Sequence, residues 1–198
     1  MTIAVDLAIL LPVEVQQTAQ RLNERFGQSG NQGFRFDESH RPHITLGQHF
    51  VSKAKFPEIR TRIDELVSEH GPIEIHVTGA QDGRTAQILS IKRVAPLQRL
   101  HEAAMDAMAP YELSTSEPDS FQSDGVPPRS ADILWVATFR NRSSYRRYAP
   151  HITIGIGTQP FTIEPFQFTA HEIAMYQLGR FCTCRNQLAR WSLQLVTS

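Results

Sequence analysis

Two segments of the chain share a six-residue pattern that contains the side chains of an acid–base catalyst. Residues 42–47 read Pro-His-Ile-Thr-Leu-Gly, and residues 150–155 read Pro-His-Ile-Thr-Ile-Gly. Each segment is predicted to form a strand, in which side chains at positions i and i+2 lie on the same face. His43 and Thr45 should therefore project together, as should His151 and Thr153.

Two imidazoles and two hydroxyls brought into one cleft could cleave a phosphodiester bond. One histidine would deprotonate the nucleophile while the other protonates the leaving oxygen. Imidazole titrates near neutral pH, so each ring can hold the protonation state that its role requires. The threonine hydroxyls could donate hydrogen bonds to the non-bridging phosphate oxygens. A neighbouring 2'-hydroxyl or a cyclic phosphate in the substrate would make a metal unnecessary, so we expect neither a metal nor another cofactor.

A single His-x-Thr pattern would more often mark a half-buried strand than a catalyst. Two copies within the same hexapeptide favour a shared site instead. Other histidines do not add a predicted metal centre: His40 and His49 flank His43, but no carboxylate or thiol is spaced to complete a ligand set. We expect both to be exposed or to lie in loops.

Residues that precede the two motifs could bind the substrate. Arg41 comes just before the first motif, and Arg147 and Tyr148 come just before the second. They are candidates for phosphate or base contacts, and a solvated basic turn is the alternative. Four aromatic residues could stack on a base, although aromatic residues in strands more often belong to the core; they are Phe50, Trp135, Tyr176 and Phe181.

The composition is that of one globular domain spanning residues 1–198. The 198 residues include 40% hydrophobic and 20% charged residues, and 20 basic residues balance 20 acidic ones. Zero net charge argues against binding to long duplex nucleic acid. Only Cys182 and Cys184 could form a disulfide, and their spacing is poor for one, which predicts a reducing, cytoplasmic location. No apolar run reaches a membrane-spanning length, and we expect a monomer.

The hydrophobic pattern predicts a duplicated arrangement of strands and helices. A strand, a proline, a helix, a loop and the motif follow one another in the first half, and the same order recurs in the second half with a longer connection. Two lobes packed face to face would place the motifs across a shared cleft. The predicted strands are 3–11, 43–50, 73–79, 85–94, 151–156, 166–178 and 191–196. The predicted helices are 13–26, 56–70 and 95–108. Residues 133–139 could be a strand or a short helix, 27–33 a loop, 140–147 a polar turn, and 110–128 the least structured stretch.

With its paired His-x-Thr-x motifs, the chain resembles the 2H phosphoesterase superfamily, which includes 2'-5' RNA ligase and RNA 2',3'-cyclic phosphodiesterase proteins. The motifs here are His43-Ile44-Thr45-Leu46 and His151-Ile152-Thr153-Ile154. The resemblance implies a bilobal α+β fold, with two antiparallel sheets lining a central cleft and helices outside. It also implies hydrolysis of 2',3'-cyclic phosphates or related phosphodiesters in a nucleotide or an RNA terminus.

Residues beside the motifs favour hydrolysis over ligation within this superfamily. No basic residue follows the second motif, where the sequence reads Gly155-Ile156-Gly157-Thr158. The first predicted strand carries no aromatic residue that could stack on a base. Joining of RNA ends through a 2'-5' bond remains an alternative, as do a nucleotide-binding module without turnover and a structural protein with vestigial repeats.

Overall fold

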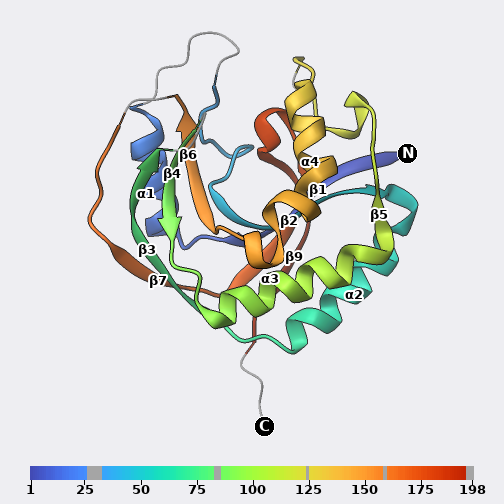
Figure 1. Ribbon diagram of the computed structural model, residues 1–198, viewed down its shortest axis with the longest axis horizontal. Coiled ribbons are helices and arrows are strands. Elements are labelled where there is room, and N and C mark those ends of the chain that lie inside the picture. Colours follow the sequence, from blue (N-terminus) through green and yellow to red (C-terminus); the bar gives the residue numbers. More distant parts are fainter. Residues whose placement is uncertain (26–32, 83–85, 124, 158–159, 195–198) are drawn as a thin grey trace.

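In a computed structural model of the protein, the described residues form nine strands in two antiparallel sheets, with helices packed outside them (Figure 1). The structure describes residues 1–25, 33–82, 86–123, 125–157 and 160–194. The helices are α1 (Val13–Asn23), α2 (Phe56–Ser68), α3 (Ala95–Met108) and α4 (Ser130–Ser143). The strands are β1 (Thr2–Leu10), β2 (His43–Ser52), β3 (Ile73–Asp82), β4 (Ala86–Ile91), β5 (Glu112–Leu113), β6 (His151–Ile156), β7 (Phe166–Ala170), β8 (Glu172–Leu178) and β9 (Cys184–Ser192).

The two motifs begin two strands that belong to different sheets. The five-stranded sheet has the order β5-β2-β1-β8-β9, and the four-stranded sheet has the order β6-β4-β3-β7. All the strand pairings of the described residues are antiparallel. Strands β2 and β6 contact each other near the centre of the molecule, which brings the motifs together (Figure 1). The predicted α+β fold with two antiparallel sheets is confirmed.

Strand β2 contains one extra residue within its motif. Leu7 of β1 pairs with Gly47, whereas the next residue, Ala8, pairs with Thr45. Leu46 is therefore unpaired and forms a β-bulge, a feature that bends a strand and redirects its side chains.

Strand β6 contains a bulge at the equivalent position of its own motif. Gln87 of β4 pairs with Gly155, whereas Ile88 pairs with Thr153, which leaves Ile154 as the extra residue. The duplication visible in the sequence thus extends to the register of the two strand pairs.

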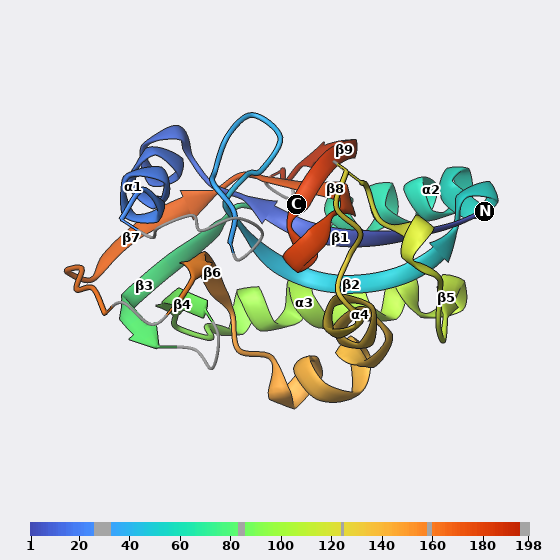
Figure 2. The ribbon, with the colours of Figure 1, turned by 90° about the horizontal axis from the view of Figure 1, so that it is seen from above.

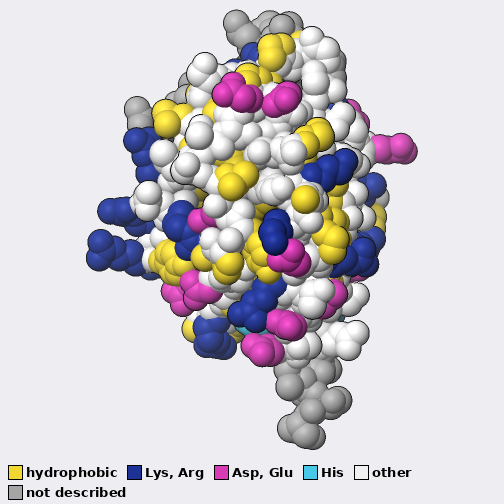
Figure 3. All heavy atoms as spheres, turned by 90° about the vertical axis from the view of Figure 1, so that its right-hand side faces the viewer, with side chains coloured by type: hydrophobic (Ala, Val, Ile, Leu, Met, Phe, Trp, Pro, Cys, Tyr) yellow, Lys and Arg dark blue, Asp and Glu magenta, His cyan; other side chains and the backbone are white. Residues whose placement is uncertain are grey.

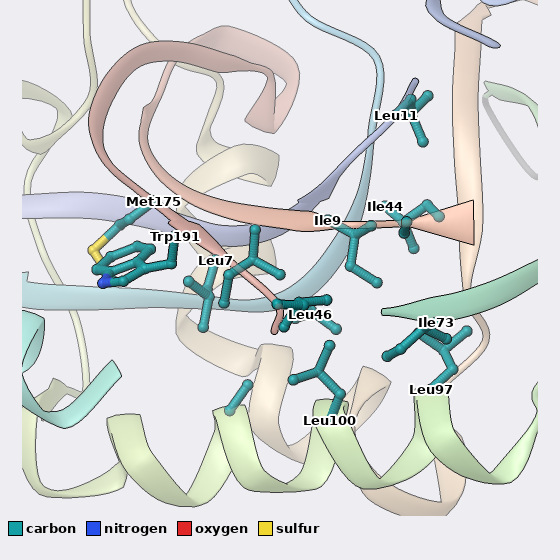
Figure 4. Close-up of a cluster of buried hydrophobic side chains, with 14 of the residues drawn as sticks. Leu7, Ile9, Leu11, Ile44, Leu46, Ile73, Leu97, Leu100, Met175 and Trp191 are labelled. Atoms are coloured by element: carbon teal, nitrogen blue, oxygen red, sulfur yellow. The ribbon is translucent and has the colours of Figure 1, made fainter. Parts of the chain in front are cut away.

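Apolar side chains of the motifs fill the interior next to helix α3. Ile44 and Leu46 are fully buried, and Leu46 lies next to Leu100 of α3 (Figure 4). Figure 2 shows α3 running along one side of β2, with α1 and α2 at opposite ends of the molecule. Burial of each leucine or isoleucine side chain contributes about 1.5–3 kcal/mol, so the motif strands are firmly fixed to the core.

Each bulge carbonyl accepts a hydrogen bond from a helix of the other half of the chain. The carbonyl of Ile154 in β6 accepts from Asn23 Nδ2 of α1 at 2.7 Å, and that of Leu46 in β2 accepts from His101 Nδ1 of α3 at 2.7 Å. Both donors are buried, with at most 1% of their surface exposed. The helices therefore support the motifs crosswise.

Three predictions about the second half of the chain were wrong. The predicted strand 166–178 is two strands, β7 and β8, which belong to different sheets and separate at His171. Residues 133–139 lie in helix α4, which extends to Ser143, so the predicted turn 140–147 begins as a helix and ends in the 3-10 turn Tyr145–Arg147. The predicted strand 191–196 begins earlier, at Cys184, and ends at Ser192.

The remaining element predictions hold apart from their ends. Helices α1 and α2 end three and two residues before the predicted limits, and α3 has the predicted bounds. Residues 110–128 contain only the two-residue strand β5 and short 3-10 turns among their described part. Most of the predicted loop 27–33, Thr85 and Val196 lie outside the described residues. Among the described helices, none has the length and apolar character needed to cross a membrane.

Candidate active site

The four motif side chains that were predicted to act together line one cavity. It has a volume of about 370 Å³, and His43 and Thr45 from β2 face it together with His151 and Thr153 from β6. Its size suits a nucleotide-sized ligand. The intervening residues Ile44, Leu46, Ile152 and Ile154 are fully buried, as strand alternation predicted.

Both imidazoles are held in the same tautomer by a backbone carbonyl two residues earlier in the chain. His43 Nδ1 lies 2.8 Å from the carbonyl oxygen of Arg41, and His151 Nδ1 lies 2.8 Å from that of Ala149. A carbonyl can only accept, so each Nδ1 carries a proton and each Nε2 is left for chemistry. The proline between carbonyl and histidine fixes the backbone of this short turn.

A buried carboxylate lies against the first motif only. Asp6 of β1 is fully buried, and its Oδ2 accepts hydrogen bonds from Thr45 Oγ1 at 2.8 Å and from Gln48 Nε2 at 2.7 Å. The same oxygen lies 3.6 Å from His43 Nε2. Asp6 Oδ1 has no hydrogen-bond partner among the described residues.

The second motif has apolar residues at the positions equivalent to this polar cluster. Asp6 pairs with Gln48 in the β1–β2 register, one position before the pair that borders the bulge. In the β4–β6 register the equivalent pair is Ala86 with Ile156. The two halves of the site thus share histidine and threonine but differ in charge.

This difference moves the two histidine pKa values in opposite directions. Burial lowers the pKa of His43, but the hydrogen bond and charge of Asp6, together with the Arg41 carbonyl, raise it above its ordinary value overall. Burial, helped by the charge of His43, lowers the pKa of His151 more than the Ala149 carbonyl and the charge of Asp6 raise it, so that the net shift is downward. Near neutral pH, His43 is thereby favoured as the protonated ring and His151 as the neutral one.

The two threonines also differ. The Thr45 hydroxyl donates its hydrogen bond to Asp6 Oδ2. The Thr153 hydroxyl faces the cavity and has no hydrogen-bond partner within the described part of the chain, so it is available to a ligand.

A second hollow adjoins the first beside His151. It has a volume of about 390 Å³ and shares four lining residues with the first cavity, which are Thr45, Trp135, Phe139 and His151. Its other walls come from β4 and from the segment before the second motif, and they include Ser90, Arg93, Arg147 and Tyr148.

The three predicted substrate-binding residues are divided between these two spaces. Arg41 lines the first cavity, whereas Arg147 and Tyr148 line the second hollow. The Arg147 guanidinium donates to the backbone carbonyl of Asn141. The Tyr148 hydroxyl donates to the carbonyl of Thr45 at 2.9 Å, and its ring stacks on His101 with centroids 3.8 Å apart. Tyr148 therefore links the two motifs structurally as well as lining the hollow.

The four candidate aromatic residues also divide into two groups. Phe50 and Tyr176 are buried in the core. Trp135 and Phe181 line the first cavity, where Phe34, Phe36 and Phe139 also face it. The prediction that His49 would be exposed or in a loop was wrong: it is buried in β2, and its Nδ1 contacts Glu112 Oε1 at 2.5 Å.

One group of side chains could hold a metal ion, and sequence spacing did not reveal it. Ligand atoms of Asp6, His43 and Cys184 lie within 4.8 Å of one another. Burial raises the pKa of the Cys184 thiol well above its ordinary value, and a metal would require its thiolate. Asp6 was itself missed as a site residue, because it stands alone in an apolar strand with no motif around it.

Comparisons with known proteins agree with this geometry. The sequence model of the 2'-5' RNA ligase superfamily matches residues 11–180, so the chain belongs to this superfamily, and the 2H phosphoesterase resemblance is confirmed. Membership supports an activity on phosphodiester bonds. Comparison with curated proteins finds no match.

Solved structures with a similar fold cover nearly the whole chain. The protein TT0787 of Thermus thermophilus is 13% identical, with a TM-score of 0.62, over 97% of this chain and 98% of the other. Escherichia coli LigT, solved with phosphate, is 17% identical, with a TM-score of 0.58, over 98% of both chains. Similarities at these identities establish the fold.

Proposed function

We propose that this protein is a metal-independent phosphodiesterase that hydrolyses 2',3'-cyclic phosphates or related phosphodiesters of nucleotides and RNA ends. The observation that carries the proposal is the pairing of two Nε2 atoms in one cavity with a carboxylate beside only one of them. General acid–base catalysis needs one protonated and one neutral group at the same pH.

The asymmetry assigns a role to each histidine. His151 Nε2 accepts a proton from the attacking water, whose oxygen forms a new bond to phosphorus. His43 Nε2, kept protonated by Asp6, donates its proton to the ribose oxygen as the phosphorus–oxygen bond breaks. The Thr153 hydroxyl donates to a non-bridging oxygen, and Thr45 helps to hold Asp6 in place. Exchange with solvent then removes the proton from His151 and returns a proton to His43, which restores both starting states.

The structural neighbours support a nucleotide as the ligand. Escherichia coli LigT has been solved with phosphate, with 3'-AMP and with ATP. Our proposal extends this ligand class to the present chain. It includes action as a monomer in the cytoplasm, where the free thiols of Cys182 and Cys184 would stay reduced. It also treats residues 1–198 as one domain of two lobes that share the site.

Hydrolysis of a panel of 2',3'-cyclic nucleotides and cyclic-ended oligonucleotides tests the proposal. We expect turnover that persists in a chelator, and a loss of about 100-fold or more in His43→Ala and in His151→Ala. His76→Ala is the matched control, because His76 lies on β3 and lines neither space of the site. Full activity of the His43→Ala/His151→Ala double variant would refute the mechanism. Tight nucleotide binding without product would favour a binding module, and joined RNA halves would favour a ligase.

A further inference from the structure

Three strands bring a carboxylate, an imidazole and a thiol together beside the first motif. Asp6 lies on β1, His43 on β2 and Cys184 on β9, and one ligand atom of each lies within 4.8 Å of the other two. Asp6 and Cys184 are buried, with at most 1% of their surface exposed, whereas the side chain of His43 keeps 15% exposed and lines the first cavity. The proposed reaction uses Asp6 and His43 but gives Cys184 no role.

The spacing of these ligand atoms suits a tetrahedral metal ion. Zn²⁺ binds nitrogen and oxygen at about 2.0–2.2 Å and sulfur at about 2.3 Å, so two of its ligands lie about 3.3–3.8 Å apart. His43 Nε2 and Asp6 Oδ2 are 3.6 Å apart, which falls within that range. The Cys184 sulfur lies within 4.8 Å of both partners, so a small shift of its side chain completes a set of three ligands.

His43 presents the nitrogen that a metal requires. Its Nδ1 donates to the Arg41 carbonyl at 2.8 Å, which leaves Nε2 as a ligand atom. Histidines that bind metals usually donate their other ring N–H to a carbonyl or a carboxylate, because this bond fixes the tautomer and orients the ring. Among the described residues, no group of metal-binding side chains includes His151, so the site belongs to the first motif alone.

Unpaired acceptor oxygens at the same place give independent support for a cation. Asp6 Oδ1 is fully buried, and no donor in the described part of the chain reaches it. Gln48 Nε2 donates to the other oxygen of Asp6, and Gln48 Oε1 is likewise buried without a described donor. A buried acceptor without a donor is costly. Two of them on side chains that are bonded to each other therefore indicate room for a positively charged ligand.

The charges of the three ligands match a divalent cation. A thiol that coordinates a metal is deprotonated, so the Asp6 carboxylate and the Cys184 thiolate carry two negative charges that one such ion neutralises. Binding would release the proton of the Cys184 thiol and the proton of His43 Nε2 to solvent. A thiolate selects zinc over magnesium, because Mg²⁺ prefers oxygen ligands in an octahedral arrangement.

We propose that Asp6, His43 and Cys184 bind one zinc ion, and that this ion inhibits the enzyme. The ion enters from the first cavity, whose wall includes His43, Gln48 and Thr183, and a water on the cavity side completes four ligands. It occupies His43 Nε2, the atom that donates a proton in the proposed reaction, so the general acid is lost. The metal site goes beyond the proposed function, whereas the inhibition rests on it.

Spectra of the protein with Co²⁺ in place of Zn²⁺ test the site without any need for turnover. We expect the wild type to show a thiolate-to-cobalt charge-transfer band in the near ultraviolet and the intense visible bands of a four-coordinate ion. Cys184→Ser should lose the charge-transfer band. Cys182→Ser is the matched control and should keep it, because that thiol contacts the Asp132 carbonyl and lies outside the ligand group. A wild type without the band, or a band that persists in Cys184→Ser, would overturn the site.

Calorimetry with Zn²⁺ measures the contribution of the thiol to affinity. Cys184→Ala should bind zinc at least about 100-fold more weakly than the wild type, since loss of even a partner outside the ligand set costs about 10–100-fold. Alanine suits this position because Cys184 belongs to a buried cluster with Ala8 and Ala174, and urea unfolding checks that the variant is folded. Equal zinc affinities of folded Cys184→Ala and the wild type would overturn the assignment.

Hydrolysis of 2',3'-cyclic AMP tests whether the bound ion inhibits. At a zinc concentration of about ten times Kd, the wild type should lose activity about tenfold, and EDTA should restore it. Cys184→Ala should keep its activity at that zinc concentration, and Mg²⁺ at the same concentration should have no effect on the wild type. Full activity of the zinc-loaded wild type would overturn the inhibition. Absence of turnover in zinc-free wild type would count against the proposed function alone, because the cobalt spectra and calorimetry decide the metal site independently.

Discussion

At the residue scale, one buried carboxylate distinguishes two motifs that are otherwise similar. Asp6 lies 3.6 Å from His43 Nε2, and the equivalent position beside His151 is occupied by Ala86. A charge in a buried setting acts strongly on its neighbour because little water screens it. In the proposed mechanism, this one difference in a neighbouring strand makes His43 the acid and His151 the base.

The pH dependence of the reaction follows from this arrangement. In the proposed mechanism activity requires neutral His151, so we expect it to fall at acidic pH below the lowered pKa of that ring. It also requires protonated His43, so it falls at alkaline pH above the raised pKa of that ring. The kcat/KM profile should be a bell with a broad top that spans the ordinary pKa of histidine.

Replacement of Asp6 by asparagine should move the alkaline limb of this bell further than the acidic limb, because Asp6 acts on His43 through both a hydrogen bond and its charge and on His151 through its charge alone. The new amide would keep an oxygen acceptor but lose the negative charge, so the pKa of His43 falls and the alkaline limb moves to lower pH. At about pH 8 we expect a loss of about tenfold or more in kcat/KM. Profiles of Asp6→Asn and wild type, with NMR titration of His43, measure the shift. A uniform loss at every pH would indicate a structural role instead.

The unpartnered hydroxyl of Thr153 gives a second prediction at this scale. Its donation to the developing charge on phosphate should be lost in Thr153→Ala, with kcat falling about 100-fold. Thr153→Ser keeps the hydroxyl and should recover most of the rate. The two variants would be compared by steady-state kinetics. Equal kcat values for them would show that the hydroxyl takes no part.

At the scale of elements, helices α1 and α3 each support the motif that lies in the opposite half of the chain. Asn23 of α1 holds the Ile154 carbonyl of β6, and His101 of α3 holds the Leu46 carbonyl of β2. A bulge leaves one backbone group without its ladder partner, and a buried unpaired carbonyl is costly. The crosswise bonds satisfy both groups and fix the two motifs relative to each other.

Removal of one of these supports should be costly for folding. Asn23 also donates to the carbonyl of Phe34 and accepts from the N–H of Phe36, so Asn23→Ala leaves several buried groups unpaired. We expect a loss of about 1–3 kcal/mol in the free energy of unfolding, measured with urea. Asn186→Ala, at an exposed position of β9, should change it by less than about 0.5 kcal/mol. A similar result for both variants would contradict the supporting role.

Sequence patterns predicted the elements that carry a clear hydrophobic period and missed those that do not. Helix α3 has its predicted bounds because its buried side chains recur at helical spacing. Helix α4 was ambiguous, since Ile133, Leu134, Trp135 and Val136 are consecutive and could equally form a strand. The break at His171 was missed because no glycine or proline marks it in the sequence, and only the divergence of the two sheets separates β7 from β8.

The same limit applies to the site. The histidines and threonines were predictable because their spacing carries strand geometry within a few residues. Asp6 was not, because its contact with His43 depends on the pairing register of β1 with β2 and on the bulge between them. The contribution of α4 to the cavity depends likewise on long-range packing.

At the scale of the whole molecule, charge is dispersed instead of concentrated. Acidic and basic side chains are interspersed over the face that Figure 3 shows, in line with the zero net charge. A field of one sign would attract long nucleic acids of any sequence. We therefore expect a nucleotide substrate to be recognised by local groups. Arg93 and Arg147 in the second hollow are examples, since neither has a carboxylate partner in the described ranges.

Buried titratable groups that hold the two halves together make the stability of the whole molecule depend on pH. Burial is the main cause that lowers the pKa of His101 to about 4, and Glu112, paired with His49 and Arg140, has its pKa lowered to about 2. His101 binds a proton more readily when unfolded, so acidification from about pH 6.5 to about 4 removes stability. Glu112 adds a further loss between about 4.5 and 2. The lowered pKa of His151 likewise makes the protein less stable on acidification, whereas the raised pKa of His43 makes it more stable on acidification.

The variant His101→Gln separates the loss of stability caused by His101 from the loss caused by Glu112. Glutamine can still donate to the Leu46 carbonyl and accept from the Tyr145 N–H, the two bonds that His101 makes, but it does not titrate. Urea unfolding at several pH values should therefore show a shallower fall in stability between about pH 6.5 and 4 for this variant. Below that range the two proteins should lose stability in parallel, because Glu112 is unchanged. If stability fell equally steeply with pH in the variant and the wild type over both ranges, protonation of His101 would not contribute to the loss of stability.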